Sequence, residues 1–312
     1  AIKADKMVYG AIQGMTAALG DPYTAFLPPQ QQTEAKADLA GAFDGVGMQL
    51  GFDKDNQLVV IAPLDGTPAQ KAGVLAQDQI LHLKDDIKKI DQDTDGLSLP
   101  EAVEIIRGPK GQPITVTLAR AGKDPLTVTL RRDTILVKSV TVEFISKTDL
   151  ENICVDCDKD SSVAYVRLSR FGDRTITEWN EAVDKIIKQS QSDKVDGLIL
   201  DVRNNPGGYF DDAVTIASEF FRDGKVVEQK GKTDSRSFSV QHPGRLPDIF
   251  LVILVNKGSA SSSEIVAGAI RARGRGQLVG ENTFGKGTVQ NAQELKSGAG
   301  LHVTIARWLL PD

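Results

Sequence analysis

The chain has 312 residues, a formal net charge of −5 and a hydrophobic share of 40%. This length exceeds the usual size of one compact core, so we expect about two or three structural units with packed interiors. The acidic balance and the lack of interleaved basic and aromatic residues exclude a typical nucleic-acid-binding protein, and no segment approaches the roughly 18 to 20 apolar residues of a membrane-spanning helix.

The first segment, residues 1–38, is predicted to be helical. Residues 7–20 carry apolar side chains at helical spacing, and Gly20 followed by Pro22 is a typical helix stop. The residues before this helix, 1–5, do not have the composition of a signal peptide. We therefore expect a packed helix that leads into the next unit.

Residues 39–135 show a different pattern, with short strands separated by turns. Two short helices are expected to interrupt the strands. Thr67 and Ser98 are each a typical helix-capping residue with a proline one or two positions later, which favours a helix start. This alternation predicts a small β-rich domain. Its strands are expected at residues 45–50, 58–62, 114–118 and 126–130, and its helices at residues 67–73 and 98–108.

Two features raise the question of a bound metal. The stretch 82–96 has spaced aspartates, but it lacks the glycine and the terminal glutamate of a calcium-binding EF-hand, so we expect a solvated surface loop. Cys154 and Cys157 supply two ligands where structural zinc takes four, and the histidines lie far away in sequence. We expect no metal and no cofactor, and favour a local disulfide in an exported protein.

From residue 161 onward, strands and helices alternate along the chain. Apolar strand-like runs are expected to be separated by amphipathic helices. Such alternation indicates an α/β layered core. The expected strands are 163–168, 195–202, 249–255 and 277–280, and the expected helices are 177–189, 211–221 and 263–273.

The junction between strand 249–255 and helix 263–273 holds a cluster of serines. Residues 259–263 read Ser-Ala-Ser-Ser-Ser, where a helix N-terminus offers N–H groups and a favourable dipole to an oxyanion. Serine in such a place is also a common helix cap. A serine nucleophile needs a base. Lys286, in the run Phe-Gly-Lys-Gly at 284–287, is suited to that role, because apolar neighbours could desolvate its amine and lower its pKa.

A second turn, Asn-Asn-Pro-Gly-Gly at residues 204–208, follows the buried strand 195–202. A strand, a glycine turn and a helix can together cradle an oxyanion through backbone N–H groups. A glycine pair alone, however, is typical of any β-to-α turn. Asp201 and Arg203 beside this turn have the residue types of a structural ion pair.

These motifs resemble those of the C-terminal processing peptidases, or tail-specific proteases, which are PDZ-containing serine proteases of the Ser-Lys type. The resemblance covers nearly the whole chain. It assigns the nucleophile to Ser261 in Gly-Ser-Ala-Ser and the base to Lys286 in Phe-Gly-Lys-Gly. It further implies that Gln290 orients the lysine amine.

The resemblance also implies an oxyanion hole with two backbone donors. One N–H comes from Gly207 or Gly208, and the other comes from Ser262, the residue after the nucleophile. Family members often have alanine at the position of Ser262, so this chain departs from the pattern there. The other serines of the cluster remain alternative nucleophiles that mutagenesis can separate from Ser261.

The fold that the resemblance implies is α/β, with a crotonase-like or ClpP-like protease core at residues 136–312 that is truncated at its C-terminal end. A β-rich PDZ domain is inserted at residues 39–135, after the helical segment 1–38. In PDZ domains a Gly-Φ-Gly-Φ loop binds the terminal carboxylate of a peptide that adds as a strand beside a helix. The helix corresponds to residues 98–107, and the loop corresponds to Gly45, Val46, Gly47 and Met48.

The resemblance implies a serine endopeptidase that recognises exposed C-terminal tails of proteins and cleaves peptide bonds through an acyl-enzyme. Its partners would be protein or peptide substrates in the periplasm or cell envelope, and a homo-oligomer and a membrane anchor outside residues 1–312 are further expectations. The alternative is a latent or inactive PDZ scaffold that only binds tails. An acyl-CoA hydrolase or isomerase on a crotonase-like core would need nucleotide binding, for which the sequence has no motif.

Overall fold

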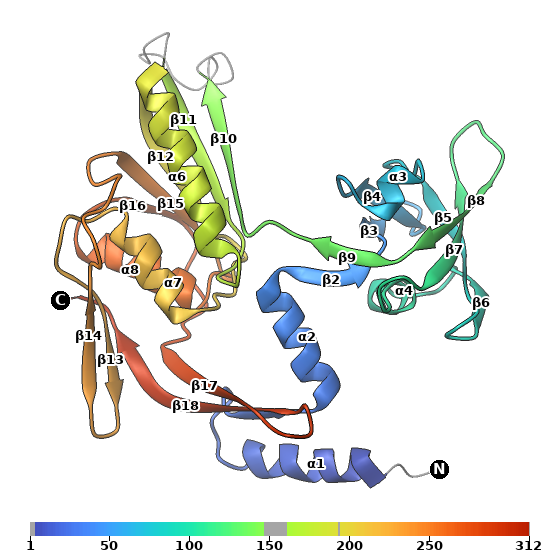
Figure 1. Cartoon of the computed structure of the whole chain (residues 1–312), viewed down its shortest axis with the longest axis horizontal. Helices are drawn as coiled ribbons and strands as arrows, with labels where there is room; N and C mark the ends of the chain where they lie inside the picture. Colours follow the sequence, from blue (N-terminus) through green and yellow to red (C-terminus); the bar gives the residue numbers. More distant parts are fainter. Residues whose placement is uncertain (1–3, 147–160, 193, 312) are drawn as a thin grey trace. The chain divides into compact units, whose positions relative to one another are not determined.

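The computed structural model describes residues 4–146, 161–192 and 194–311 (Figure 1). The chain divides into two compact units: residues 42–137 form one, and residues 1–41 with 138–312 form the other, here called the core unit. The N-terminal residues were predicted as a segment of their own but belong to the core unit, because strand β1 (Ala25–Leu27) pairs with strand β18 (Gly300–Leu309). The cysteines of the predicted disulfide, Cys154 and Cys157, lie outside the described residues.

The core unit contains a five-stranded sheet in the order β10-β11-β12-β15-β16, in which β10 is antiparallel and the other strands are parallel. The four strands predicted after residue 161 are present within two residues of their expected bounds. Strand β10 was not predicted. The five strands are β10 (Val140–Ser146), β11 (Ser161–Leu168), β12 (Lys194–Asp201), β15 (Phe250–Val255) and β16 (Gln277–Gly280).

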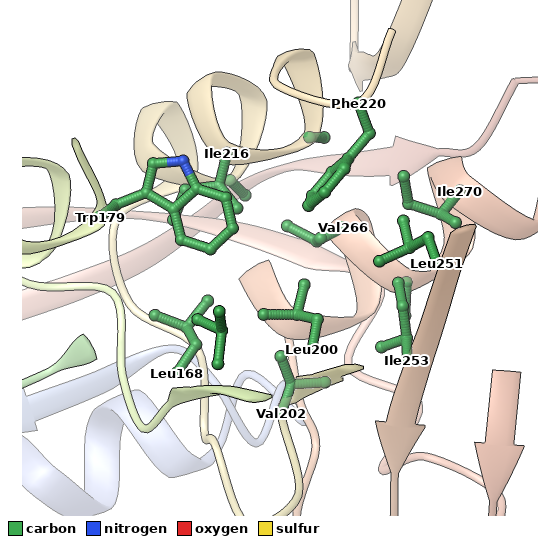
Figure 2. Packing of buried hydrophobic residues seen from close by; sticks show 14 of the residues in the cluster. Leu168, Trp179, Leu200, Val202, Ile216, Phe220, Leu251, Ile253, Val266 and Ile270 are labelled. Carbon is green, nitrogen blue, oxygen red and sulfur yellow. The ribbon is translucent and has the colours of Figure 1, made fainter. Parts of the chain in front are cut away.

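Three helices pack on this sheet: α6 (Thr175–Ser192), α7 (Phe210–Ser218) and α8 (Ser262–Ala272). Figure 2 shows Leu200 and Ile253 from the sheet among the same buried side chains as Val266 of α8 and Trp179 of α6. Strands β12 and β15 are parallel neighbours, so the turns that follow them meet at one edge of the sheet. This edge carries the glycine turn and the serine cluster.

A second five-stranded sheet belongs to the same unit and was not predicted. Its strands run in the order β1-β18-β13-β14, with β17 (Thr288–Glu294) also paired to β18. The remaining strands are β13 (Lys225–Gly231) and β14 (Ser235–Ser239). Because β17 begins two residues after Lys286, this sheet fixes the chain that leaves the lysine turn.

Two helices precede the other elements of the core unit. Helix α1 (Ala4–Ala17) begins and ends three residues earlier than the predicted 7–20. Helix α2 (Pro29–Ala40) was not predicted; it has proline at its start and ends at Gly41, whose left-handed backbone (φ 63°) caps the last carbonyls. Among the described helices, none combines the length and the apolar character needed to span a membrane.

The unit formed by residues 42–137 is rich in strands. Its sheet has the order β3-β4-β5-β7-β8, and β2 (Ala42–Gly45) pairs with β9 (Asp133–Leu136) where the chain enters and leaves. Helices α3 (Pro68–Lys71) and α4 (Leu99–Ile106) lie within the two predicted helical segments. The sheet strands are β3 (Met48–Phe52), β4 (Leu58–Pro63), β5 (Gln79–Asp85), β7 (Pro113–Ala119) and β8 (Leu126–Arg131).

The charged stretch 82–96 is not the surface loop that the sequence predicted. Strand β6 (Ile90–Asp93) pairs with β5 and forms a hairpin. Two aspartates of this hairpin have side-chain partners: His82 contacts Asp91 and Asp93 at 2.8 Å each, and Lys84 contacts Asp91 at 3.1 Å. In the described part of the chain, no group of three or more acidic, histidine or cysteine side chains is arranged to hold a metal.

Candidate active site

The glycine turn after β12 begins at a buried carboxylate. Asp201 is 1% exposed and accepts hydrogen bonds from the Arg203 guanidinium (2.7 Å) and the Tyr165 hydroxyl (2.6 Å). Burial alone would raise the pKa of Asp201, but these bonds and the charge of Arg167 outweigh it and hold the pKa at about 2. The predicted ion pair between Asp201 and Arg203 is therefore present, and it anchors the first residues of the turn.

Hydrogen bonds join the glycine turn to the serine turn. The side chain of Asn256 accepts from the Asn204 N–H and donates to the Asn204 side chain, at 2.8 Å each. The Ala260 N–H donates to the carbonyl of Asn205 at 3.0 Å. The two turns are thus held against each other along most of their length.

Ser261 occupies a strained position between β15 and α8. Its backbone has φ 54° and ψ −116°, a conformation that glycine ordinarily adopts. A serine held in this way costs of order 1–3 kcal/mol, and such strain clusters at functional sites. A sharp strand-to-helix turn of this kind also exposes the nucleophilic serine of α/β-hydrolases.

Three of the four serine hydroxyls in the cluster donate hydrogen bonds to backbone carbonyls, and one does not. Ser259 donates to the carbonyl of Val202 at 2.8 Å, and Ser263 donates to that of Asn205 at 2.9 Å. Ser262 donates to two carbonyls, those of Gly208 and Tyr209, at 3.1 Å each. All three serines are at most 1% exposed. Ser261 is half-buried, and its hydroxyl donates to no acceptor in the described part of the chain.

The glycine turn lies directly against Ser261. A Cβ atom at Gly207 would come within 2.8 Å of Ser261 Cβ and 3.0 Å of the Ser262 nitrogen, and Gly207 also has a positive φ of 96°. Asn205 Oδ1 already accepts the Gly207 N–H at 2.9 Å. The N–H groups of Gly208 and Ser262 have no acceptor among the described residues.

One carboxylate connects the serine turn to the lysine turn. Glu264 Oε2 accepts the N–H groups of Ser261 (2.7 Å) and Lys286 (2.9 Å). Glu264 Oε1 accepts the Thr283 hydroxyl and the Gly285 N–H, at 2.7 Å each. No role for Glu264 was predicted from the sequence. The feature that could have indicated one is its position three residues after Ser261, which is typical of a capping box.

Lys286 is half-buried. Burial lowers its pKa, while the carboxylates of Asp21 and Glu264 act in the opposite direction. Its Nζ lies 5.0 Å from the centre of the Tyr23 ring, a cation–π arrangement. Because of this contact with Tyr23, the amine faces the N-terminal segment of the core unit. Burial and the charge of Lys286 also lower the pKa of His302.

Two contacts that the resemblance implies are not made in this arrangement. The Gln290 side chain donates to the hydroxyls of Thr288 (2.8 Å) and Thr304 (3.3 Å) and not to Lys286. Within the described residues, no hydrogen bond joins the side chains of Ser261 and Lys286. The approach of Asp21 and Tyr23 to the lysine was not predicted either, because the sequence around Gly20 and Pro22 indicates only the end of a helix.

The predicted carboxylate-binding loop lies between β2 and β3 of the 42–137 unit. Val46 is 1% exposed, and Gly47 has a positive φ of 77° and no room for a side chain beside Thr67. The carbonyl of Gly47 accepts the Leu64 N–H at 2.8 Å. The N–H groups of Val46 and Gly47 have no acceptor in the described ranges.

Comparison with known proteins supplies the family. The sequence profile of Peptidase family S41 matches residues 162–312. The carboxyl-terminal-processing protease of Picosynechococcus is 38% identical over 99% of this chain and 70% of that protein. The chain belongs to peptidase family S41. Another family member, the carboxy-terminal processing protease CtpA of Bacillus subtilis, is 34% identical over 99% of this chain, which spans 61% of that protein's length.

A solved structure agrees with the S41 assignment. The photosystem II D1 C-terminal processing protease is 32% identical, with a TM-score of 0.57 over 100% of this chain and 79% of that one. The resemblance to C-terminal processing peptidases that the motifs indicated is therefore confirmed at the level of the family.

Proposed function

We propose that the chain is a serine endopeptidase in which Ser261 is the nucleophile and Lys286 is the base. The observation that carries this assignment is the division of the serine cluster. Three of its hydroxyls donate hydrogen bonds to backbone carbonyls, and the hydroxyl of Ser261 donates to no acceptor among the described residues. Its turn also shares the Glu264 carboxylate with the turn of Lys286.

In the proposed reaction the Ser261 oxygen attacks the scissile carbonyl, and the neutral amine of Lys286 takes the hydroxyl proton. The carbonyl oxygen becomes an oxyanion bound by the N–H groups of Gly208 and Ser262. Lys286 then gives its proton to the leaving amine, which departs and leaves an ester on Ser261. Water hydrolyses this ester by the same steps. We favour Gly208 over Gly207 as a donor, because Asn205 already holds the Gly207 N–H.

The lysine must turn for this reaction to occur. Its amine faces Tyr23, and Gln290 is bound to two threonines. We propose that catalysis requires rotation of the Lys286 side chain from the Tyr23 ring toward Ser261, with Gln290 then orienting the amine. The lack of a hydrogen bond between the side chains of Ser261 and Lys286 among the described residues is also the observation that favours the second candidate, a latent or inactive tail-binding scaffold.

We further propose that residues 42–137 form a PDZ domain inserted into a crotonase-like core. Strand β3 lies at the edge of its sheet, so its free side can accept a peptide as an added strand, with α4 on the other side. The N–H groups of Val46 and Gly47 would bind the terminal carboxylate, with Gly45 and Met48 flanking them. The ligand would be an exposed C-terminal tail of a protein substrate.

The compartment and the assembly are expectations from the family resemblance. We propose an extracytoplasmic enzyme. A homo-oligomer and a membrane anchor outside residues 1–312 stay predictions.

The test is cleavage of a loosely folded protein with an apolar C-terminal tail by the wild type, Ser261→Ala and Lys286→Ala, with tail binding measured in parallel. Both variants should lose cleavage and keep binding. Lys257→Ala, which removes an exposed lysine close to the serine turn, is the matched control and should cleave normally. Full activity in Lys286→Ala would overturn the proposed base. A wild type that binds tails without cutting them would support the scaffold.

A further inference from the structure

The hydroxyl of Ser262 holds the end of the glycine turn. It is 1% exposed and donates to the carbonyls of Gly208 and Tyr209 at 3.1 Å each. We propose that this hydroxyl is a positioning group for the oxyanion hole, a role separate from that of the Ser262 N–H. The inference rests on the proposed peptidase function and deepens it.

Gly208 needs such a restraint because glycine has the most backbone freedom of any residue. Its φ is 141°, and it has no side chain to anchor it. On one side the chain is held by Phe171, which accepts the Tyr209 N–H at 2.9 Å and donates to Gly207 at 3.0 Å. Those bonds fix the turn to the segment that follows β11 and not to Ser261.

On the other side, the Ser262 hydroxyl is the connection to the nucleophile. Within the described residues, it makes the only hydrogen bonds between the serine turn and Gly208–Tyr209. The hydroxyls of Ser259 and Ser263 bind earlier residues, Val202 and Asn205. Ser262 therefore supplies one oxyanion donor and, through the Gly208 carbonyl, holds the residue that carries the other, so that a single residue restrains the spacing of the two.

The variant Ser262→Ala tests this role, because it keeps the N–H and removes only the hydroxyl. Loss of an oxyanion donor costs about 100- to 1,000-fold in kcat, and a loosened donor should cost less. We expect kcat to fall by roughly tenfold with KM changed less than about twofold. Affinity for a peptide boronic acid, whose tetrahedral adduct places an oxygen in the hole, should fall with kcat, while affinity for the unreactive parent peptide should not.

The matched control is Ser218→Ala. Ser218 is also fully buried, and its hydroxyl donates to the carbonyl of Val214 at 2.7 Å within α7, away from the site. The control should lose thermal stability comparably and keep its kcat. Ser262→Cys, which has a weaker donor of similar size, should show an intermediate kcat and decides the matter if Ser262→Ala does not fold.

The outcomes separate this inference from the proposed function. Wild-type kcat and boronate affinity in folded Ser262→Ala or Ser262→Cys would overturn the positioning role and leave the Ser261–Lys286 assignment intact. An equal loss of kcat in Ser218→Ala would overturn it as well, since the effect would then be one of stability. A wild type that neither cleaves nor binds the boronic acid would overturn both.

Discussion

Glu264→Gln is expected to weaken the connection between the turns of Ser261 and Lys286, the proposed nucleophile and base. The carboxylate is 7% exposed and accepts four hydrogen bonds, two at each oxygen. Glutamine replaces one of these oxygens with an NH₂ group, which can only donate. If Oε2 is replaced, the N–H groups of Ser261 and Lys286 lose their shared acceptor. If Oε1 is replaced, the Thr283 hydroxyl and the Gly285 N–H lose theirs, and the lysine turn is held only through the Lys286 N–H.

The magnitude follows from the number of bonds. A hydrogen bond to a charged group contributes about 1.5–3 kcal/mol, so the loss of two amounts to roughly 3–6 kcal/mol, divided between stability and catalysis. If about 3 kcal/mol of this falls on the transition state, kcat/KM decreases by roughly 100-fold. Peptide cleavage and calorimetric melting of the same variant would measure the two parts.

Glu219→Gln is the matched control for Glu264→Gln. Glu219 is 2% exposed and accepts hydrogen bonds from the backbone and side chain of Arg245, in the core and away from the two turns. This variant should melt earlier and keep kcat/KM within about threefold of the wild type, since nothing at the site depends on it. If Glu264→Gln also stays within threefold, the link that the carboxylate makes between the two turns does not contribute to catalysis.

Three further outcomes are expected. Asp21→Asn removes a negative charge that raises the pKa of Lys286, so the pKa falls and the rise of kcat/KM with pH moves to lower pH; Glu34→Gln, in an exposed part of the same segment, should leave the profile in place. Gly207→Ala places a Cβ 2.7–3.0 Å from the nucleophile turn and should reduce kcat by more than about 100-fold at wild-type tail affinity. Arg132→Met leaves a buried carboxylate without its cation, which should lower hydrogen-exchange protection of the 42–137 unit by about 3–5 kcal/mol.

The parts of the fold that the sequence predicted well are those with a strong local signal. Strands such as 250–255 are continuous apolar runs in a parallel sheet covered by helices, and their bounds came out within two residues. The second sheet was missed for the opposite reason. Strand β18 has few fully buried residues, and two of its partners, β1 and β13, lie far from it in the chain, so its place in the sheet depends on tertiary pairing.

The candidate site was predictable to a similar degree. The serine and glycine turns each follow a strand of the parallel sheet, and adjacent parallel strands bring their following turns together, so the motifs alone place them side by side. The surroundings of Lys286 were not predictable in this way. Tyr23 and Asp21 reach the lysine because β1 pairs with β18, and neither strand had been recognised from the sequence.

The conformation of Ser261 differs from that of an ordinary helix cap and supports its proposed role as the nucleophile. An N-cap residue normally has extended backbone angles, and a serine at that position gains its stabilisation without strain. Ser261 instead has a positive φ, although Ser98, at the start of α4, begins its helix with φ −72° and ψ 157°. Capping therefore does not require the strain seen at Ser261, whereas directing a hydroxyl out of a tight strand-to-helix turn does. The free energy stored in that turn is best explained by the presentation of the hydroxyl to a substrate.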